Sequence, residues 1–249
     1  MNESIALMLF FSATVLVAGY VRGYGGFGFS MITVAALSLF CAPAQVVPVV
    51  LLLEVAASLF LVSGTWHLVN WPILSWLLIG VVAGTPVGVW MLGNVSSAPM
   101  KMAVAMIIFM LALMLRQGFV VNRRLKRPET MAAGLASGVL NGAAAIGGPP
   151  AILFFFSSPA GAAVSRASLI AFFLVTGILA AGFCNAAGLM TPGHAGQALI
   201  LALPMALGLF LGKLAYTRTP ETVFKKRVLL YLMMLSLLTL VRSAKPFFS

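Results

Sequence analysis

The sequence predicts an all-α membrane protein: a polytopic helical bundle of two inverted repeats, each with a broken helical hairpin plus three full spans. Of the 249 residues, 62% are hydrophobic and only 8% are charged, whereas a soluble domain of this size carries about 25% charged residues. Apolar runs of span length recur along the chain, and two glycine-rich interruptions occupy matching places in its two halves. Lipid is therefore the solvent that fits this composition.

Uninterrupted apolar runs predict six full spans, because a helix needs about 20 apolar residues to cross the hydrocarbon core. Each run is bounded by glycine, proline, asparagine or a charged residue. The six runs are Ala44–Val62, Ile73–Leu92, Pro99–Leu115, Ser168–Ala187, Ala195–Ala215 and Val223–Val241.

Two further apolar stretches, Ile5–Cys41 and Met131–Phe156, are interrupted. The first contains four glycines within residues 23–28, and the second contains the sequence Ile-Gly-Gly-Pro-Pro at 146–150. Glycine adds backbone freedom and proline removes a hydrogen-bond donor, so a helix is expected to unwind at both places. Each stretch is therefore predicted to form a broken hairpin.

The two halves resemble each other when one is shifted by 119 residues. The shift places Gly19 on Gly138, Gly23 on Gly142 and Gly28 on Gly147. We therefore expect a first membrane repeat at 1–116, a basic cytoplasmic linker at 117–130 and a second membrane repeat at 131–249. The motifs Gly-x-x-x-Gly at 84–88 and 208–212 are typical of close helix crossings.

The cations favour an inverted arrangement of the halves. If each broken stretch returns to its starting side, most of the 15 Lys and Arg residues fall on one side, as the positive-inside rule requires. If each stretch crosses once instead, Arg166 and the basic cluster at 213–227 move outside. The first arrangement predicts a multi-pass protein of the cell inner (plasma) membrane with both termini outside. Cations confined to loops between apolar runs do not favour a nucleic-acid partner.

The glycine segments carry a family resemblance. Residues 22–28 and 142–150, with the segments 84–88 and 203–212, resemble the sulfite exporter TauE/SafE family of transporters. The resemblance runs along essentially the whole chain. It implies transport of sulfite, sulfonates or related sulfur-containing anions. Many members have three successive glycines at the breaks, where this chain has Phe29-Ser30 and Pro149-Pro150.

Broken helices supply what an anion needs at membrane depth, because the free amides of a helix N-terminus carry about half a positive charge. Two breaks related by pseudo-symmetry are expected to face one midplane site and to support alternating access. Amides near 26–30 and 147–151 are the expected donors. The predicted substrate-binding residues are Arg22, Gly25, Gly26, Gly28, Ser30, Asn141, Gly147, Gly148, Pro149 and Pro150. Close glycine packing without a ligand is the alternative.

Arg22 is the most specific single candidate for a functional residue, because intramembrane charges are costly and usually functional. Snorkelling to the headgroups is the other interpretation. Glu54, the only acid inside a predicted span, is expected either to couple protons or to pair with Arg22 or Arg166.

Several alternatives stay open. No catalytic pair, metal cluster or cofactor motif stands out, so neither an enzyme nor a cofactor is expected. The rival functions are a membrane assembly subunit that transports nothing, and a transporter of another small anion or of cations. The expected partners are a small anionic substrate and the lipid bilayer, and the sequence leaves open whether the chain forms a homo-oligomer.

Overall fold

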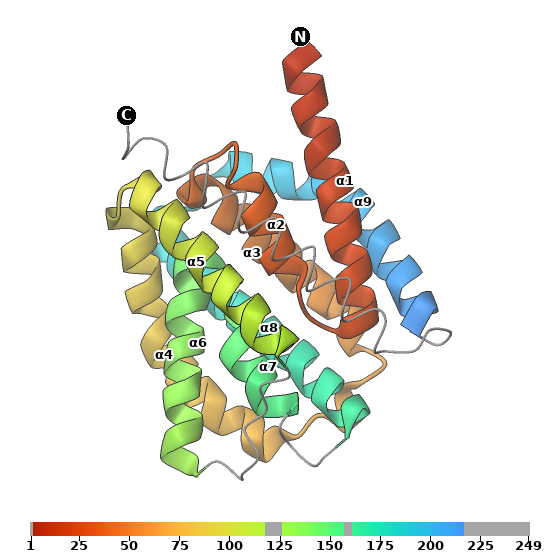
Figure 1. Ribbon diagram of the computed structural model, residues 1–249, viewed down its shortest axis with the longest axis vertical. Coiled ribbons are helices and arrows are strands. Elements are labelled where there is room, and N and C mark those ends of the chain that lie inside the picture. The colour runs from red at the N-terminus through yellow and green to blue at the C-terminus, as the bar shows by residue number, and fades with distance from the viewer. Residues whose placement is uncertain (1, 118–125, 157–160, 217–249) are drawn as a thin grey trace.

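The computed structural model describes residues 2–117, 126–156 and 161–216, and these residues form a bundle of helices (Figure 1). The first half contains α1 (Asn2–Gly25), α2 (Phe29–Leu37), α3 (Pro43–Val62), the short 3₁₀ helix η1 (Trp66–Leu68), α4 (Trp71–Asn94) and α5 (Ser97–Arg116). The second half contains α6 (Arg127–Ala144), α7 (Gly148–Phe156), α8 (Ala162–Ala186) and α9 (Pro192–Tyr216).

Five of these helices are long and apolar enough to cross a membrane, namely α1, α3, α4, α8 and α9. Four of them coincide with spans that the sequence predicts, which confirms a multi-pass all-α membrane protein. The fifth, α1, reaches span length by itself, so the first broken stretch pairs one long helix with one short helix. In α5 the apolar part is the shorter stretch Ser97–Met110. The expected span Val223–Val241 lies outside the described residues.

The element boundaries repeat at the interval found in the sequence. An interval of 119 residues separates the end of α1 from the end of α6. The same interval separates both boundaries of α2 from those of α7, and the start of α3 from the start of α8. Both interruptions are shorter than their motifs suggest, at 26–28 and 145–147. Gly23 and Gly25 are still helical, and Gly148 already begins α7.

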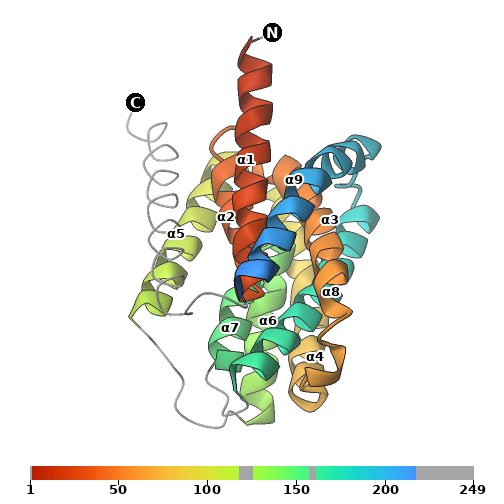
Figure 2. The ribbon, with the colours of Figure 1, turned by 90° about the vertical axis from the view of Figure 1, so that its right-hand side faces the viewer.

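Two helix pairs cross closely through glycine faces, α1 with α9 and α4 with α6 (Figures 1 and 2). A Cβ added at Gly84 would collide with the backbone of Leu135, and one added at Gly208 would collide with the backbone of Leu16. The crossing role predicted for these glycine motifs is confirmed. Each crossing packs the first α-helix of one half against the fourth α-helix of the other half. In Figure 1, α1 runs downward from the N-terminus, whereas α6 starts at the lower end and runs upward.

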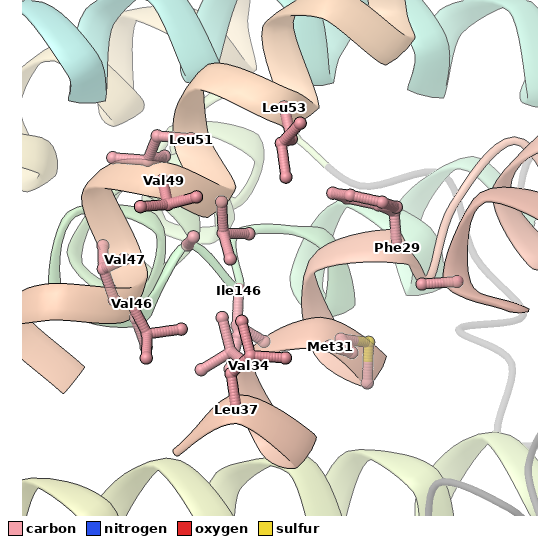
Figure 3. Close-up of a cluster of buried hydrophobic side chains, with 14 of the residues drawn as sticks. Phe29, Met31, Val34, Leu37, Val46, Val47, Val49, Leu51, Leu53 and Ile146 are labelled. Carbon is pink, nitrogen blue, oxygen red and sulfur yellow. The ribbon is translucent and has the colours of Figure 1, made fainter. Parts of the chain in front are cut away.

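The short helix α2 lies in the interior, and all nine of its residues are buried. It packs against the first part of α3 as an antiparallel pair. At one end of this seam Ser30 donates a hydrogen bond to Glu54, and at the other end Leu37 and Val46 line the same outer cavity. Between these ends the seam is apolar, and Figure 3 shows Val34, Leu37, Val46 and Ile146 gathered there.

Candidate functional site

Both predicted interruptions are real breaks with left-handed backbone. Gly26 has a φ of 78° and Gly28 a φ of 95° in the first break. At the position matching Gly26, the second break has Ala145, with a φ of 55°. Ala145 is the one residue other than glycine with a positive φ in the described part of the chain, and such a conformation persists only where the surroundings enforce it.

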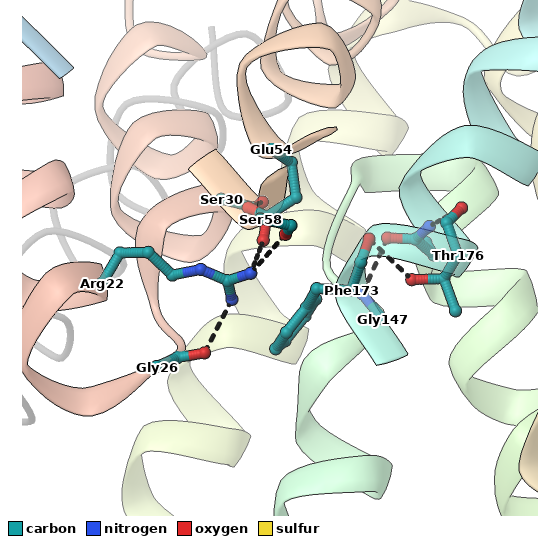
Figure 4. A network of polar contacts seen from close by, with 9 residues as sticks. Arg22, Gly26, Ser30, Glu54, Ser58, Gly147, Phe173 and Thr176 are labelled. Atoms are coloured by element: carbon teal, nitrogen blue, oxygen red, sulfur yellow. Dashed lines mark hydrogen bonds and ion pairs between the residues drawn. The ribbon is translucent and has the colours of Figure 1, made fainter. Parts of the chain in front are cut away.

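A buried polar network holds the first break (Figure 4). Arg22, on the last turn of α1, is fully buried and donates through Nη1 to the carbonyl oxygen of Gly26 at 2.8 Å. Its Nη2 donates to Ser58 Oγ at 2.7 Å and lies 2.8 Å from Glu54 Oε1. Of the two pairings that the sequence leaves open for Glu54, the structure therefore has the one with Arg22.

One hydrogen-bond donor of this network has no acceptor in the part of the chain that the structure describes. Within the described residues, Arg22 Nε has no hydrogen-bond acceptor. A buried guanidinium N–H without an acceptor is costly, especially on a charged group. Arg22 is thus paired but incompletely satisfied, and it is not an arginine snorkelling to headgroups.

Asn141 holds the second break from the position that matches Arg22. Its Nδ2 donates to the carbonyl oxygen of Thr176 at 2.9 Å, and its Oδ1 accepts from the Gly147 amide at 3.3 Å. The first bond ties α6 to α8, and the second fixes the backbone of the break. The Gly147 amide, expected to be free for an anion, is therefore already engaged in this conformation.

Arg166, on the first turns of α8, contacts the end of α1. Its Nε donates to the carbonyl oxygen of Tyr24 at 3.2 Å and its Nη2 to that of Gly23 at 2.6 Å. The guanidinium also lies 4.4 Å from the ring centroid of Tyr216. A cation at the carbonyl end of a helix complements the helix dipole. This side chain therefore caps α1, and no ion pair to an acid is seen for it among the described residues.

The two breaks meet at one small cavity of about 10 Å³. Its walls are Gly28, Ser30, Met31, Glu54, Ala145, Ile146, Gly148 and Phe173. A volume of this size holds about one water molecule. Three of the predicted substrate-binding residues, Gly28, Ser30 and Gly148, line it directly, and so does Glu54.

Arg22 does not line this cavity. Its guanidinium contacts Glu54 and lies 4.4 Å from the ring centroid of Phe173, and both of these residues do line it. Glu54 and Phe173 therefore separate the cation from the cavity. The direct exposure of Arg22 to a ligand, which the sequence favours, is absent in this conformation.

The sequence reasoning missed Phe173, although the repeat contained the signal. The shift of 119 residues places Phe173 on Glu54, Gly177 on Ser58 and Pro149 on Ser30. The polar partners of Arg22 thus belong to the first half, and the second half has apolar residues at the same positions. The site is pseudo-symmetric in backbone and asymmetric in charge.

The first turns of α2 and α7 offer unequal numbers of donors. An α-helix leaves its first four amides without intrahelical acceptors. In α2, residues 29–31 retain these amides, whereas at the matching positions of α7 Pro149 and Pro150 have none and only Gly148 does. The amide contribution to an anion site would therefore come mainly from the first half.

The fold and this geometry define a class of protein: a multi-pass helical membrane protein in which two broken helices meet beside a buried ion pair. Within the described residues no group of three or more His, Cys, Asp and Glu side chains lies close enough to hold a metal ion. No curated protein and no solved structure matches the chain.

Residues 11–240 match the family described as Sulfite exporter TauE/SafE, and the chain belongs to this family. The resemblance seen at the glycine segments is thereby confirmed. The family indicates a membrane transporter of sulfur-containing anions such as sulfite.

Proposed function

We propose that the protein carries a small sulfur-containing anion across the cell inner membrane, and that the anion binds between the two helix breaks. The observation that supports this most is that both breaks line one cavity, with a fully buried arginine one side chain behind it. First-turn amides of α2 and the Ser30 hydroxyl supply donors. Arg22 supplies the compensating charge.

Glu54 acts in this proposal as an internal competitor of the substrate. In this conformation its carboxylate neutralises Arg22 and accepts a hydrogen bond from Ser30. A second anion beside this carboxylate is opposed by charge repulsion in a medium of low dielectric constant. A proton on Glu54 removes the competing charge and frees the guanidinium. Entry of one anion is thereby coupled to uptake of one proton.

Alternating access follows from the two halves. The repeat of element boundaries at 119 residues, the exchanged glycine crossings and the opposite directions of α1 and α6 support an inverted repeat (Figure 1). In such transporters one half moves against the other around a central site. The small volume of the cavity corresponds to an occluded conformation.

The route from the outside is expected to open along the seam between α2 and α3. A cavity of about 390 Å³ lies at its far end, between the first turns of α1, α3 and α9, and its lining includes Leu37 and Val46. The apolar seam separates this cavity from the central site (Figure 3). Separation of α2 from α3 would break the Ser30–Glu54 hydrogen bond, which links opening to the state of the carboxylate.

The test is sulfite flux into proteoliposomes under an imposed pH gradient, with Arg22→Ala and Asn141→Ala variants. We expect Arg22→Ala to abolish transport and Asn141→Ala to reduce it strongly, because the second break loses the bond to its Gly147 amide. Lys101→Ala is the matched control: this cation is on α5, away from the cavity lining. Unchanged flux in both site variants would refute the proposed site.

A further inference from the structure

Phe173 occupies the space between the buried cation and the second break. The side chain comes from α8, is only 4% exposed, and stacks over the guanidinium of Arg22 at 4.4 Å (Figure 4). On its other side the ring meets the start of α7: a Cβ added at Gly148 would lie 2.7 Å from Phe173 Cζ. The ring is thus in contact with both halves of the candidate site.

The cavity must expand before any sulfur oxyanion fits. Even sulfite has four heavy atoms, whereas the volume of about 10 Å³ accommodates about one water molecule. Backbone contacts hold both breaks in place, through Arg22 at Gly26 and through Asn141 at Gly147. Among the side chains that line the cavity, the largest whose displacement would add room for a ligand is Phe173.

The position of the ring also decides what shape of ligand reaches the cation. Glu54 is held by Ser30 and Arg22 on the first-half side, so displacement of the ring opens the approach from the second-half side. A compact anion needs only a small displacement. An anion with an organic substituent has to place that substituent where the ring packs against Gly148.

We propose that Phe173 is the specificity-determining residue of the site, and that it restricts the substrate to compact inorganic sulfur oxyanions and excludes sulfonates with bulky organic groups. This rests on the proposed function and names the substrate class of the same site. The aromatic ring also stabilises the resting guanidinium through its π face. Glycine at position 148 is then required because any side chain there would push the ring onto the cation.

The experiment compares inhibition of sulfite uptake by methanesulfonate and by benzenesulfonate in proteoliposomes. In the unmodified protein, benzenesulfonate is expected to inhibit sulfite uptake far more weakly than an excess of sulfite itself does. In Phe173→Ala we expect inhibition by benzenesulfonate to strengthen about tenfold or more relative to methanesulfonate, since pockets discriminate such size differences by about one to two orders of magnitude. Phe155→Ala is the matched control, because Phe155 is equally buried in the same cluster and does not line the cavity.

The outcomes separate the two proposals. An unmodified protein that moves no sulfite refutes the proposed function. An unmodified protein that moves sulfite, with the same inhibition profile in Phe173→Ala, refutes the specificity role alone. If the alanine variant does not fold, Phe173→Leu keeps apolar volume while shortening the side chain. An unchanged profile in Phe173→Leu would then overturn the inference.

Discussion

The ion pair between Arg22 and Glu54 allows a quantitative test, because removal of either partner leaves a buried charge. The side chains are 0% and 2% exposed, and Nη2 and Oε1 are 2.8 Å apart. Breaking a buried pair by removing one partner costs about 3–5 kcal/mol. For a chain of 249 residues this corresponds to a fall of about 6–20 °C in Tm.

The variants Arg22→Met, Glu54→Leu and their combination form a double-mutant cycle, measured by thermal unfolding in detergent. We expect each single variant to lose stability as above. The combined variant should recover most of the loss, because apolar replacement of a whole buried pair is often neutral or stabilising. Recovery of stability without recovery of sulfite flux would separate the structural part of the pair from its part in transport.

Added sulfite distinguishes the two partners. Glu54→Gln leaves Arg22 without its carboxylate, so sulfite should stabilise this variant more than it stabilises the unmodified protein, with a larger rise in Tm. At 100 times its Kd for the variant, sulfite should add about 2.7 kcal/mol to the free energy of unfolding. Arg22→Met should show no such shift. A combined variant no more stable than either single one, or a sulfite shift that survives in Arg22→Met, would refute the reasoning.

Three further predictions concern the surrounding structure. Gly84→Ala should lower the free energy of unfolding by about 1–3 kcal/mol through overpacking against α6. Gly182→Ala, which has open space at its Cβ, should be neutral or stabilising in the same unfolding assay. Equal effects of the two substitutions would contradict the close crossing of α4 and α6. Arg166→Ala should lower the free energy of unfolding by about 1.5–3 kcal/mol for each lost hydrogen bond to the end of α1, and the folded fraction should keep its affinity for sulfite. A loss of sulfite affinity without a loss of stability would contradict the capping role. Cys41 lines the outer cavity, and burial raises the pKa of its thiol, against a smaller opposite effect of Lys101. Because the thiolate is the reactive form, the rate of maleimide labelling of Cys41, measured in a Cys184→Ala background, should rise at higher pH than the rate for an exposed cysteine. Labelling of Cys41 as fast as that of a free thiol at neutral pH would contradict this.

Much of the fold was predictable because the bilayer imposes simple rules on sequence. The presence of the long helices α3, α4, α8 and α9 follows from apolar length, and both breaks follow from glycine and proline. The glycine crossings were readable from their spacing. The start of the first break was misplaced by a few residues, because Gly23 serves the crossing with α9 and is not needed for the turn.

The partners within the site were not predictable. Glu54 had two cations available in the sequence, and the choice of Arg22 depends on how α1 and α3 are rotated toward each other. Phe173 is one of many aromatic residues in apolar context, and its place over Arg22 becomes visible only when α8 is packed against the first break. Asn141 was identified by the repeat, but its use of the Gly147 amide was not.

The sequence by itself determined the solvent, the spans, the two interruptions and their repeat, because each depends on local composition and on the fixed thickness of the membrane. Only the tertiary structure decided that the cation is covered by a carboxylate from its own half and an aromatic ring from the other. Contacts between residues far apart in the chain depend on the packing and rotation of whole helices, which no local pattern encodes.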